Sequence, residues 1–204
     1  RRRTNNLLFR VETTAEEAMR EFWIKNNFME VHSPKIVGAP SESGAELFTL
    51  DYFDRKAYLA QSPQFYKQMA MASGFERIFE IAPVFRADPS FTARHMTEFT
   101  GVDAEMSWID SHEDVMISEE TMLRDVYQTV KEKHGDEIKE LFGTDIIVPE
   151  LPFPRIPMRE AIEILKNRGY TIPADKKGDI DPGGEREIAA YVKEKYNHDF
   201  VFLT

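Results

Sequence analysis

Cysteine is absent from the 204-residue sequence. Its absence excludes disulfides, thiolate zinc sites, iron–sulfur clusters and a cysteine nucleophile. The chain also lacks any apolar run near the ~18 residues of a membrane span, and no apolar signal core follows the basic residues 1–3. We therefore expect a cytoplasmic protein with no membrane association.

An excess of basic residues is missing too. Lys plus Arg number 26 against 36 Asp plus Glu, a formal charge of −10, which argues against a surface that binds nucleic acid generally. Any nucleic-acid contact must be local. At 42% hydrophobic and 12% aromatic residues the composition is that of a globular protein. Its length, divided by ~150 residues per domain, gives about 1.4, so we expect one domain.

Both termini of the sequence read as cuts. The chain opens at Arg1 rather than at an initiator Met, and it closes on a β-prone apolar run, 200–203, that no turn signal ends. We expect that run to be a strand whose later neighbours lie outside the chain.

Hydrophobic periodicity predicts helices separated by short strands. A stripe from Val11 to Phe22 predicts a first helix that stops at 26–27, and Ser62, Pro63 and Gly74 bracket a helix over 63–73. Ser111 and Asp114 form a capping box for a long helix that runs to 134–135. Two further helices are predicted near 157–167 and 185–196.

Strands are predicted at 28–34, where Pro34 stops the first, and at 47–50, 57–60, 78–86 and 97–108, with a small, polar loop over 38–46. The last two strands favour an antiparallel hairpin with a long loop. The fold class is therefore α+β, an antiparallel sheet with helices packed against it.

Side-chain alternation on the hairpin brings chemistry to one face. Phe99, Gly101, Asp103 and Glu105 share a face of the second strand, while Arg86 ends the first. A glycine within a strand often marks close approach of a ligand or another backbone, and Phe99 offers a surface on which a ring can stack.

Three cations lie around the mouth of this hairpin, Arg86 and the loop residues Arg94 and His95. With Phe99 they suit a nucleoside triphosphate, because guanidinium groups bind phosphoryl oxygens and a purine stacks. The alternative that the hairpin alone leaves open is that Arg86 pairs with Asp103 or Glu105 on a half-solvated sheet face.

A second candidate site lies on the helix at 63–73. Gln64 and Lys67 are three residues apart near its N-terminal end, where a small carboxylate would be favoured. Taken alone, this pair fits a solvated lysine on an amphipathic helix better.

Other patterns in the sequence do not indicate a functional site. Asp179, Asp181 and Glu185 have the wrong spacing for a calcium loop and indicate a solvated turn. No P-loop and no G-x-S-x-G motif occurs, which excludes those nucleotide and serine-hydrolase sites.

Three segments together resemble the aspartyl-tRNA synthetases, in their archaeal and eukaryotic cytoplasmic form: QSPQFYKQ (61–68), FRADPSFTARHMTEF (85–99) and VDAEM (102–106). The resemblance runs from about Leu8 to Thr204. It implies that 1–204 is part of a class II synthetase catalytic domain, ending before the third motif and without the anticodon-binding domain. It further implies that the chain by itself has little or no activity in forming the aminoacyl-adenylate.

The resemblance implies residue roles in ATP binding. Arg86 would hold the α-phosphate and act in catalysis, and Phe99 would stack on adenine. Arg94 and His95 would lie near the outer phosphates and the tRNA end. Asp88 replaces the family's usual Glu with a shorter acid.

For the amino acid, the resemblance implies that Lys67 pairs with the side-chain carboxylate of L-aspartate, that Gln64 bonds near its backbone groups and that Asp103 takes its ammonium group. Glu42 would lie on a loop that closes over the substrate. Pro34 would be the fixed point of a homodimer interface.

The implied activity is ATP-dependent formation of aspartyl-adenylate and transfer to the 3′ end of tRNA(Asp), with tRNA(Asn) as a further candidate and Mg²⁺ held by ligands outside the chain. Two alternatives remain open. One is an asparaginyl-tRNA synthetase or an archaeal asparagine synthetase relative, which Lys67 disfavours. The other is a truncated, non-catalytic paralogue that acts as a binding module.

Overall fold

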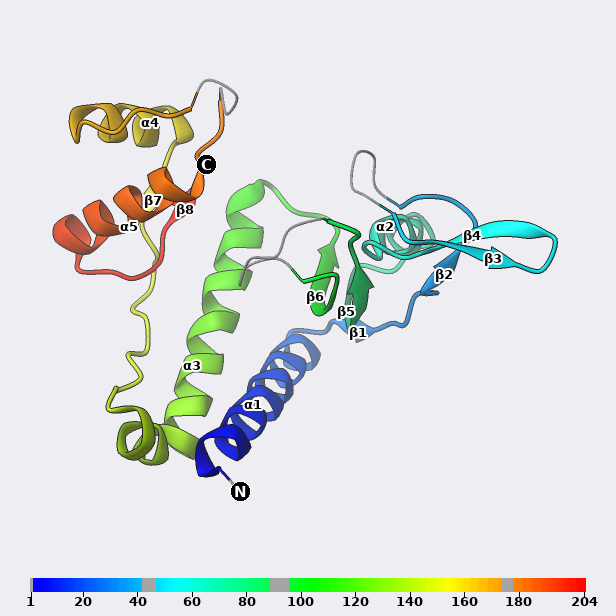
Figure 1. Cartoon of the computed structure of the whole chain (residues 1–204), viewed down its shortest axis with the longest axis horizontal. Coiled ribbons are helices and arrows are strands. Elements are labelled where there is room, and N and C mark those ends of the chain that lie inside the picture. Colours follow the sequence, from blue (N-terminus) through cyan, green and yellow to red (C-terminus); the bar gives the residue numbers. More distant parts are fainter. Residues whose placement is uncertain (1, 42–46, 89–95, 174–177) are drawn as a thin grey trace. The chain divides into compact units, whose positions relative to one another are not determined.

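The computed structural model describes residues 2–41, 47–88, 96–173 and 178–204, within which it shows five helices and eight strands (Figure 1). The chain falls into two compact units, one of Arg1–Met19 with His112–Thr204 and one of Arg20–Ser111. Composition marks no boundary between them. The helices are α1 (Arg3–Lys25), α2 (Gln64–Ala72), α3 (His112–Phe142), α4 (Met158–Asn167) and α5 (Pro182–Tyr196), and the strands are β1 (Met29–Glu30), β2 (Ile36–Val37), β3 (Thr49–Tyr52), β4 (Arg55–Leu59), β5 (Arg77–Phe85), β6 (Glu98–Met106), β7 (Arg155–Ile156) and β8 (Phe202–Leu203).

The predicted hairpin is the centre of the Arg20–Ser111 unit. Strands β5 and β6 pair antiparallel over their whole length, from Arg77 opposite Met106 to Phe85 opposite Glu98. Strand β1 joins them parallel to β5, in the order β1-β5-β6. The sheet is therefore mixed, and the strand predicted over 28–34 is shortened to two paired residues.

Aromatic packing fixes the start of this sheet. The ring centroids of Trp23 and Phe28 lie 4.7 Å apart and those of Trp23 and Phe79 lie 6.4 Å apart, and all three side chains are buried. Asn27 adopts φ +64°, a left-handed conformation that Asn tolerates, and so turns the chain from α1 into β1. The end predicted for the first helix is confirmed.

A second sheet has the order β2-β4-β3 and includes a hairpin that projects beyond α2 in Figure 1. The strands of this hairpin, β3 and β4, lie closer to the turn that joins them than the strands predicted at 47–50 and 57–60. Tyr52 pairs with Arg55 across a two-residue turn at 53–54, so the ladder continues through charged residues that hydrophobicity alone had left out.

Helix α2 begins one residue later than predicted. Pro63 precedes the first helical residue, and the Ser62 hydroxyl accepts a hydrogen bond from the Gln64 amide at 3.3 Å. Gly74 follows the helix with φ +95°, the conformation that ends a helix and that glycine adopts without strain. The helix predicted over 63–73 is confirmed within one residue at each end.

In the other unit, α3 runs beyond its predicted end at 134–135 and reaches Phe142. A glycine weakens a helix by only about 1 kcal/mol, and contacts with α1 hold the turns after Gly135. Glu140 accepts from Arg3 at 2.7 Å, and Glu137 pairs with Arg10. Tertiary contacts therefore override the stop signal.

Helices α4 and α5 pack with the parallel pair β7 and β8 around a small apolar core of Ile156, Ala161, Leu165, Ile180, Ile188 and Val192. The turn predicted at 179–185 is instead a helix start. Asp181 accepts hydrogen bonds from the Gly183 and Gly184 amides, each at 3.3 Å, and from the Tyr170 hydroxyl. The 200–203 strand is confirmed in part, as the two residues of β8.

The α+β class is confirmed. Although α1 and α3 are long, no helix in the described part of the chain carries an apolar stretch that would cross a bilayer.

Candidate functional site

Lys67 lies on α2 and reaches the hairpin. Its ammonium Nζ is 2.6 Å from Oδ1 of Asp103 and 3.4 Å from Oε2 of Glu105, both on β6. The Lys67 side chain is only 14% exposed. The solvated lysine favoured by the helix pattern alone is thus not what the fold contains.

The charge state of Lys67 follows from these neighbours. Burial by itself would lower the pKa of the ammonium, but the hydrogen bond and charge of Asp103, with those of Glu105, outweigh it and raise the pKa. Lys67 is therefore a charged, half-buried group whose positive end is shared by two carboxylates. Gln64 lies one turn earlier on α2 and is partly buried.

The register confirms which hairpin residues share a face. Val84 is opposite Phe99, Ala82 is opposite Gly101, and Glu80 is opposite Asp103. Directly opposite residues point to the same side of a sheet. An added Cβ at Gly101 would meet Val84 only at 3.5 Å, an ordinary contact, so the protein's own atoms do not require glycine there.

Arg86 lies at the far end of this face. Its guanidinium carbon is 5.7 Å from the centre of the Phe99 ring, a cation–π arrangement. Its amide donates to the Thr97 carbonyl at 3.0 Å. Asp88 follows three residues after the end of β5 and is partly buried.

The salt bridge between Arg86 and Asp103 or Glu105, weighed from the sequence, is excluded by distance. Arg86 lies six residues along the chain from Glu80, the partner of Asp103, which is about 20 Å at ~3.3 Å per residue. Arg86 with Phe99 and Asp103 with its partner Lys67 therefore lie toward different ends of the hairpin.

A cavity of about 120 Å³ opens beside Lys67. It is smaller than the ~300–1,000 Å³ typical of pockets for drug-sized ligands, and so suits a small molecule. Arg86, Phe99 and Gln64 are not among its lining residues. Its polar and charged lining consists of His32, Ser33, Tyr66, Lys67, Glu80, Asp103 and Glu105, and Pro34 also lines it.

Two acids of the site were not predicted as site residues. Alternation along β6 had placed Glu105 on the face of Asp103, but the sequence offered it only as an ion-pair partner for Arg86. Glu80 is 3% exposed and binds Ser33 and Lys35, contacts that are long-range in sequence and give no local signal.

Three predicted residues, Glu42, Arg94 and His95, lie outside the described residues. Pro34 is exposed and borders the cavity. Within the described ranges there is no group of three or more acidic, His or Cys side chains that could hold a metal ion.

Comparison with known proteins identifies relatives across the whole chain. The family described as tRNA synthetases class II (D, K and N) matches residues 1–204. The aspartate–tRNA(Asp/Asn) ligase of Aeropyrum pernix is 42% identical over 96% of the chain, and the aspartate–tRNA(Asp) ligase of Thermococcus kodakarensis is 40% identical over the same share. The chain spans 44% of the length of each.

Solved structures agree in fold. The asparaginyl-tRNA synthetase of Pyrococcus horikoshii, complexed with asparaginyl-adenylate, superposes with a TM-score of 0.79 at 35% identity, over 93% of this chain and 42% of that one. The aspartyl tRNA synthetase of Entamoeba histolytica gives a TM-score of 0.80 at 33% identity, over 97% and 37%.

Proposed function

The chain belongs to the class II tRNA synthetases of the D, K and N group, and from this we propose that it forms the amino-acid and ATP-binding part of an aspartate–tRNA ligase. The observation that carries the proposal is the partly buried Lys67–Asp103 ion pair beside a small cavity. The complete gene product would activate L-aspartate with ATP and transfer it to tRNA(Asp), with tRNA(Asn) as a second acceptor.

Free aspartate complements this ion pair. Its ammonium group would pair with the Asp103 carboxylate, and its side-chain carboxylate would pair with the Lys67 ammonium. Both protein charges would therefore keep a partner when the ligand binds. Asparagine would offer Lys67 a neutral amide. Because Lys67 is partly buried and keeps Glu105 at 3.4 Å, the loss of one charge-assisted hydrogen bond sets the scale, about 1.5–3 kcal/mol. The pair therefore favours aspartate over asparagine.

ATP would lie toward the Arg86 end, with adenine stacked on Phe99 and the α-phosphate at the guanidinium. An oxygen of the α-carboxylate of aspartate attacks the α-phosphorus. The bond between the α-phosphorus and the oxygen that bridges it to the β-phosphate breaks, and pyrophosphate leaves. Arg86 stabilises the charge that develops on the α-phosphoryl oxygens, which needs no proton transfer.

The described acids do not form a Mg²⁺ site. Lys67 contacts both Asp103 and Glu105, while Lys35 and Ser33 bind Glu80, so each of these three acids is already engaged by a group of the protein. No step of the proposal runs through a metal held by these residues. The proposal includes a cytoplasmic homodimer, with the exposed Pro34 at its interface.

The test is calorimetric titration of the complete gene product with L-aspartate, L-asparagine and ATP. Lys67→Met should weaken aspartate binding by about 100-fold, the equivalent of ~3 kcal/mol, and leave ATP affinity within about threefold. Lys56→Met, which changes an exposed lysine, is the matched control. Tight asparagine binding by the unaltered protein would favour the asparaginyl alternative instead.

A further inference from the structure

Glu80 is a buried acid that no proposed step uses. It lies on β5 at 3% exposure, and its carboxylate accepts from the Ser33 amide at 2.7 Å, the Ser33 hydroxyl at 2.7 Å and Lys35 Nζ at 3.0 Å. A carboxylate survives burial only when it is paired and hydrogen-bonded in this way. Glu80 is thus committed to the chain segment that carries Ser33 and Lys35.

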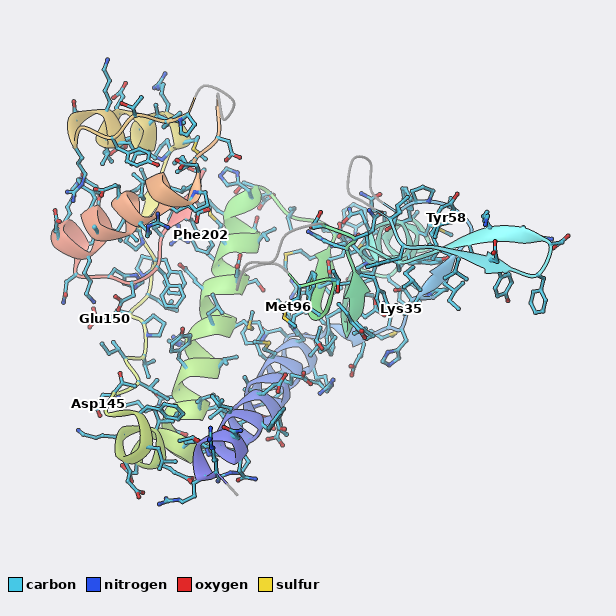
Figure 2. All side chains as sticks on the ribbon, viewed as in Figure 1. Lys35, Tyr58, Met96, Asp145, Glu150 and Phe202 are labelled. Atoms are coloured by element: carbon cyan, nitrogen blue, oxygen red, sulfur yellow. The ribbon has the colours of Figure 1, made fainter. Side chains whose placement is uncertain are left out.

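That segment forms one wall of the cavity. Its strand pairing ends early: the Val31 amide donates to the Phe79 carbonyl, and the next described backbone bond of the segment runs from the Ala60 amide to the Lys35 carbonyl. Between these two points Glu80 holds Ser33, which lines the cavity with Lys67 and Asp103. Lys35, the last residue of this segment before β2, is one of the labelled side chains in Figure 2.

Glu80 also acts on the electrostatics of the pocket. It is directly opposite Asp103 on the same face of the hairpin, and like charges in that position destabilise a sheet. Lys35 pairs with Glu80 and Lys67 pairs with Asp103, so each carboxylate has its own lysine. With Lys35 bound to Glu80, the repulsion on Asp103 and on any ligand carboxylate is reduced.

We propose that Glu80 is a positioning residue of the amino-acid pocket: it fixes the Ser33–Lys35 wall and, with Lys35, balances the charge beside Asp103, without touching the substrate. The inference rests on the proposed function. It assigns an effect on amino-acid affinity to a residue whose direct contacts are all with the protein itself.

The test compares Glu80→Gln with Glu76→Gln, an exposed acid just before β5, in the complete gene product. Gln keeps the shape and an acceptor for the Ser33 amide but loses the charge that holds Lys35. We expect L-aspartate binding to weaken about tenfold, with ATP affinity little changed. Glu76→Gln should bind both ligands as the parent does.

A merely structural Glu80 would weaken both ligands together or neither, and either result overturns the proposal. If Glu80→Gln fails to fold, Lys35→Met removes the same ion pair from the other side; it lowers the free energy of unfolding, but of the two ligand affinities it should weaken only that for aspartate. Hydrogen exchange of the ligand-free protein separates this proposal from the proposed function. The Ser33 amide should exchange faster in Glu80→Gln than in the parent even if the parent binds no aspartate; unchanged exchange contradicts the wall-fixing role.

Discussion

Glu80 and Asp103 lie directly opposite each other on β5 and β6, and each is held by a different lysine, Lys35 at 3.0 Å and Lys67 at 2.6 Å. Two like charges side by side on a sheet need such compensation. The pair of lysines links the hairpin to α2 on one side and to the segment before β2 on the other. The stability of the sheet face and the chemistry of the pocket therefore depend on the same four residues.

Removing one compensating lysine should destabilise the fold. Lys35→Met leaves the Glu80 carboxylate buried with only Ser33 as a donor, at a cost of about 1–3 kcal/mol in free energy of unfolding. Adding Glu80→Gln should recover part of that loss, because the uncompensated charge is gone. Urea denaturation of the single and double variants measures these changes in free energy of unfolding. If the two single changes simply added in the double variant, the pairing of Lys35 with Glu80 would be contradicted.

ATP binding should depend on Phe99 and aspartate binding should not. Phe99→Ala removes the ring beneath Arg86, and base–aromatic stacking is worth about 1–3 kcal/mol, so ATP affinity should fall about 10- to 100-fold. Phe99 does not line the aspartate pocket. Equal losses for the two ligands, measured by calorimetry on the complete gene product, would show that the face is not divided as described.

Low pH should lower the stability of the unit formed by Arg1–Met19 and His112–Thr204, because it protonates Glu120. Burial favours the neutral acid, but hydrogen bonds from Arg155 and the Phe153 amide outweigh it and lower the pKa of Glu120. A lowered folded-state pKa adds stability that is present above the ordinary value near ~4.3 and is lost as pH falls through the folded value. Thermal unfolding of Glu120→Gln should lie about 4–10 °C below the parent at pH 7, a gap that narrows as pH falls toward 3.

The exposed neighbour Glu119 provides the control for that series. Glu119→Gln should follow the parent at every pH. A gap between Glu120→Gln and the parent that stays constant from pH 7 to 3 would mean that the Glu120 charge does not contribute.

Asp181 should matter as a helix cap. Asp181→Ala removes the acceptor for the Gly183 and Gly184 amides and should lower the unfolding midpoint by about 2–4 °C. Tyr170→Phe keeps the cap and removes only the hydroxyl that donates to Asp181, so its effect should be smaller. An Asp181→Ala midpoint equal to that of Tyr170→Phe would contradict the capping role.

Local patterns in the sequence predict the parts of this fold that depend on local physics. Alternation along 97–108 correctly placed Asp103 and Glu105 on one face, and Gly74 correctly marked the end of α2. Helix α3 was predicted too short, because Arg3 and Arg10, more than a hundred residues away, hold its last turns.

The contacts that make the site are likewise non-local. Lys67 meets Asp103 across 36 residues, and Ser33 meets Glu80 across 47, so no periodicity in the chain reports either pair. Resemblance to a family, rather than pattern, brought Lys67 forward as a binding residue. The partly buried ion pair now gives that prediction a physical basis, while the role of Lys67 in binding aspartate stays a prediction.

The most direct test of the aspartate assignment is ATP–pyrophosphate exchange by the complete gene product, measured with each of the twenty amino acids. Exchange should depend on L-aspartate, and Lys67→Met should abolish it while Lys56→Met leaves it intact. Exchange supported by L-asparagine in place of L-aspartate, or aspartate-dependent exchange that survives Lys67→Met, would contradict the assignment of Lys67 to the aspartate carboxylate.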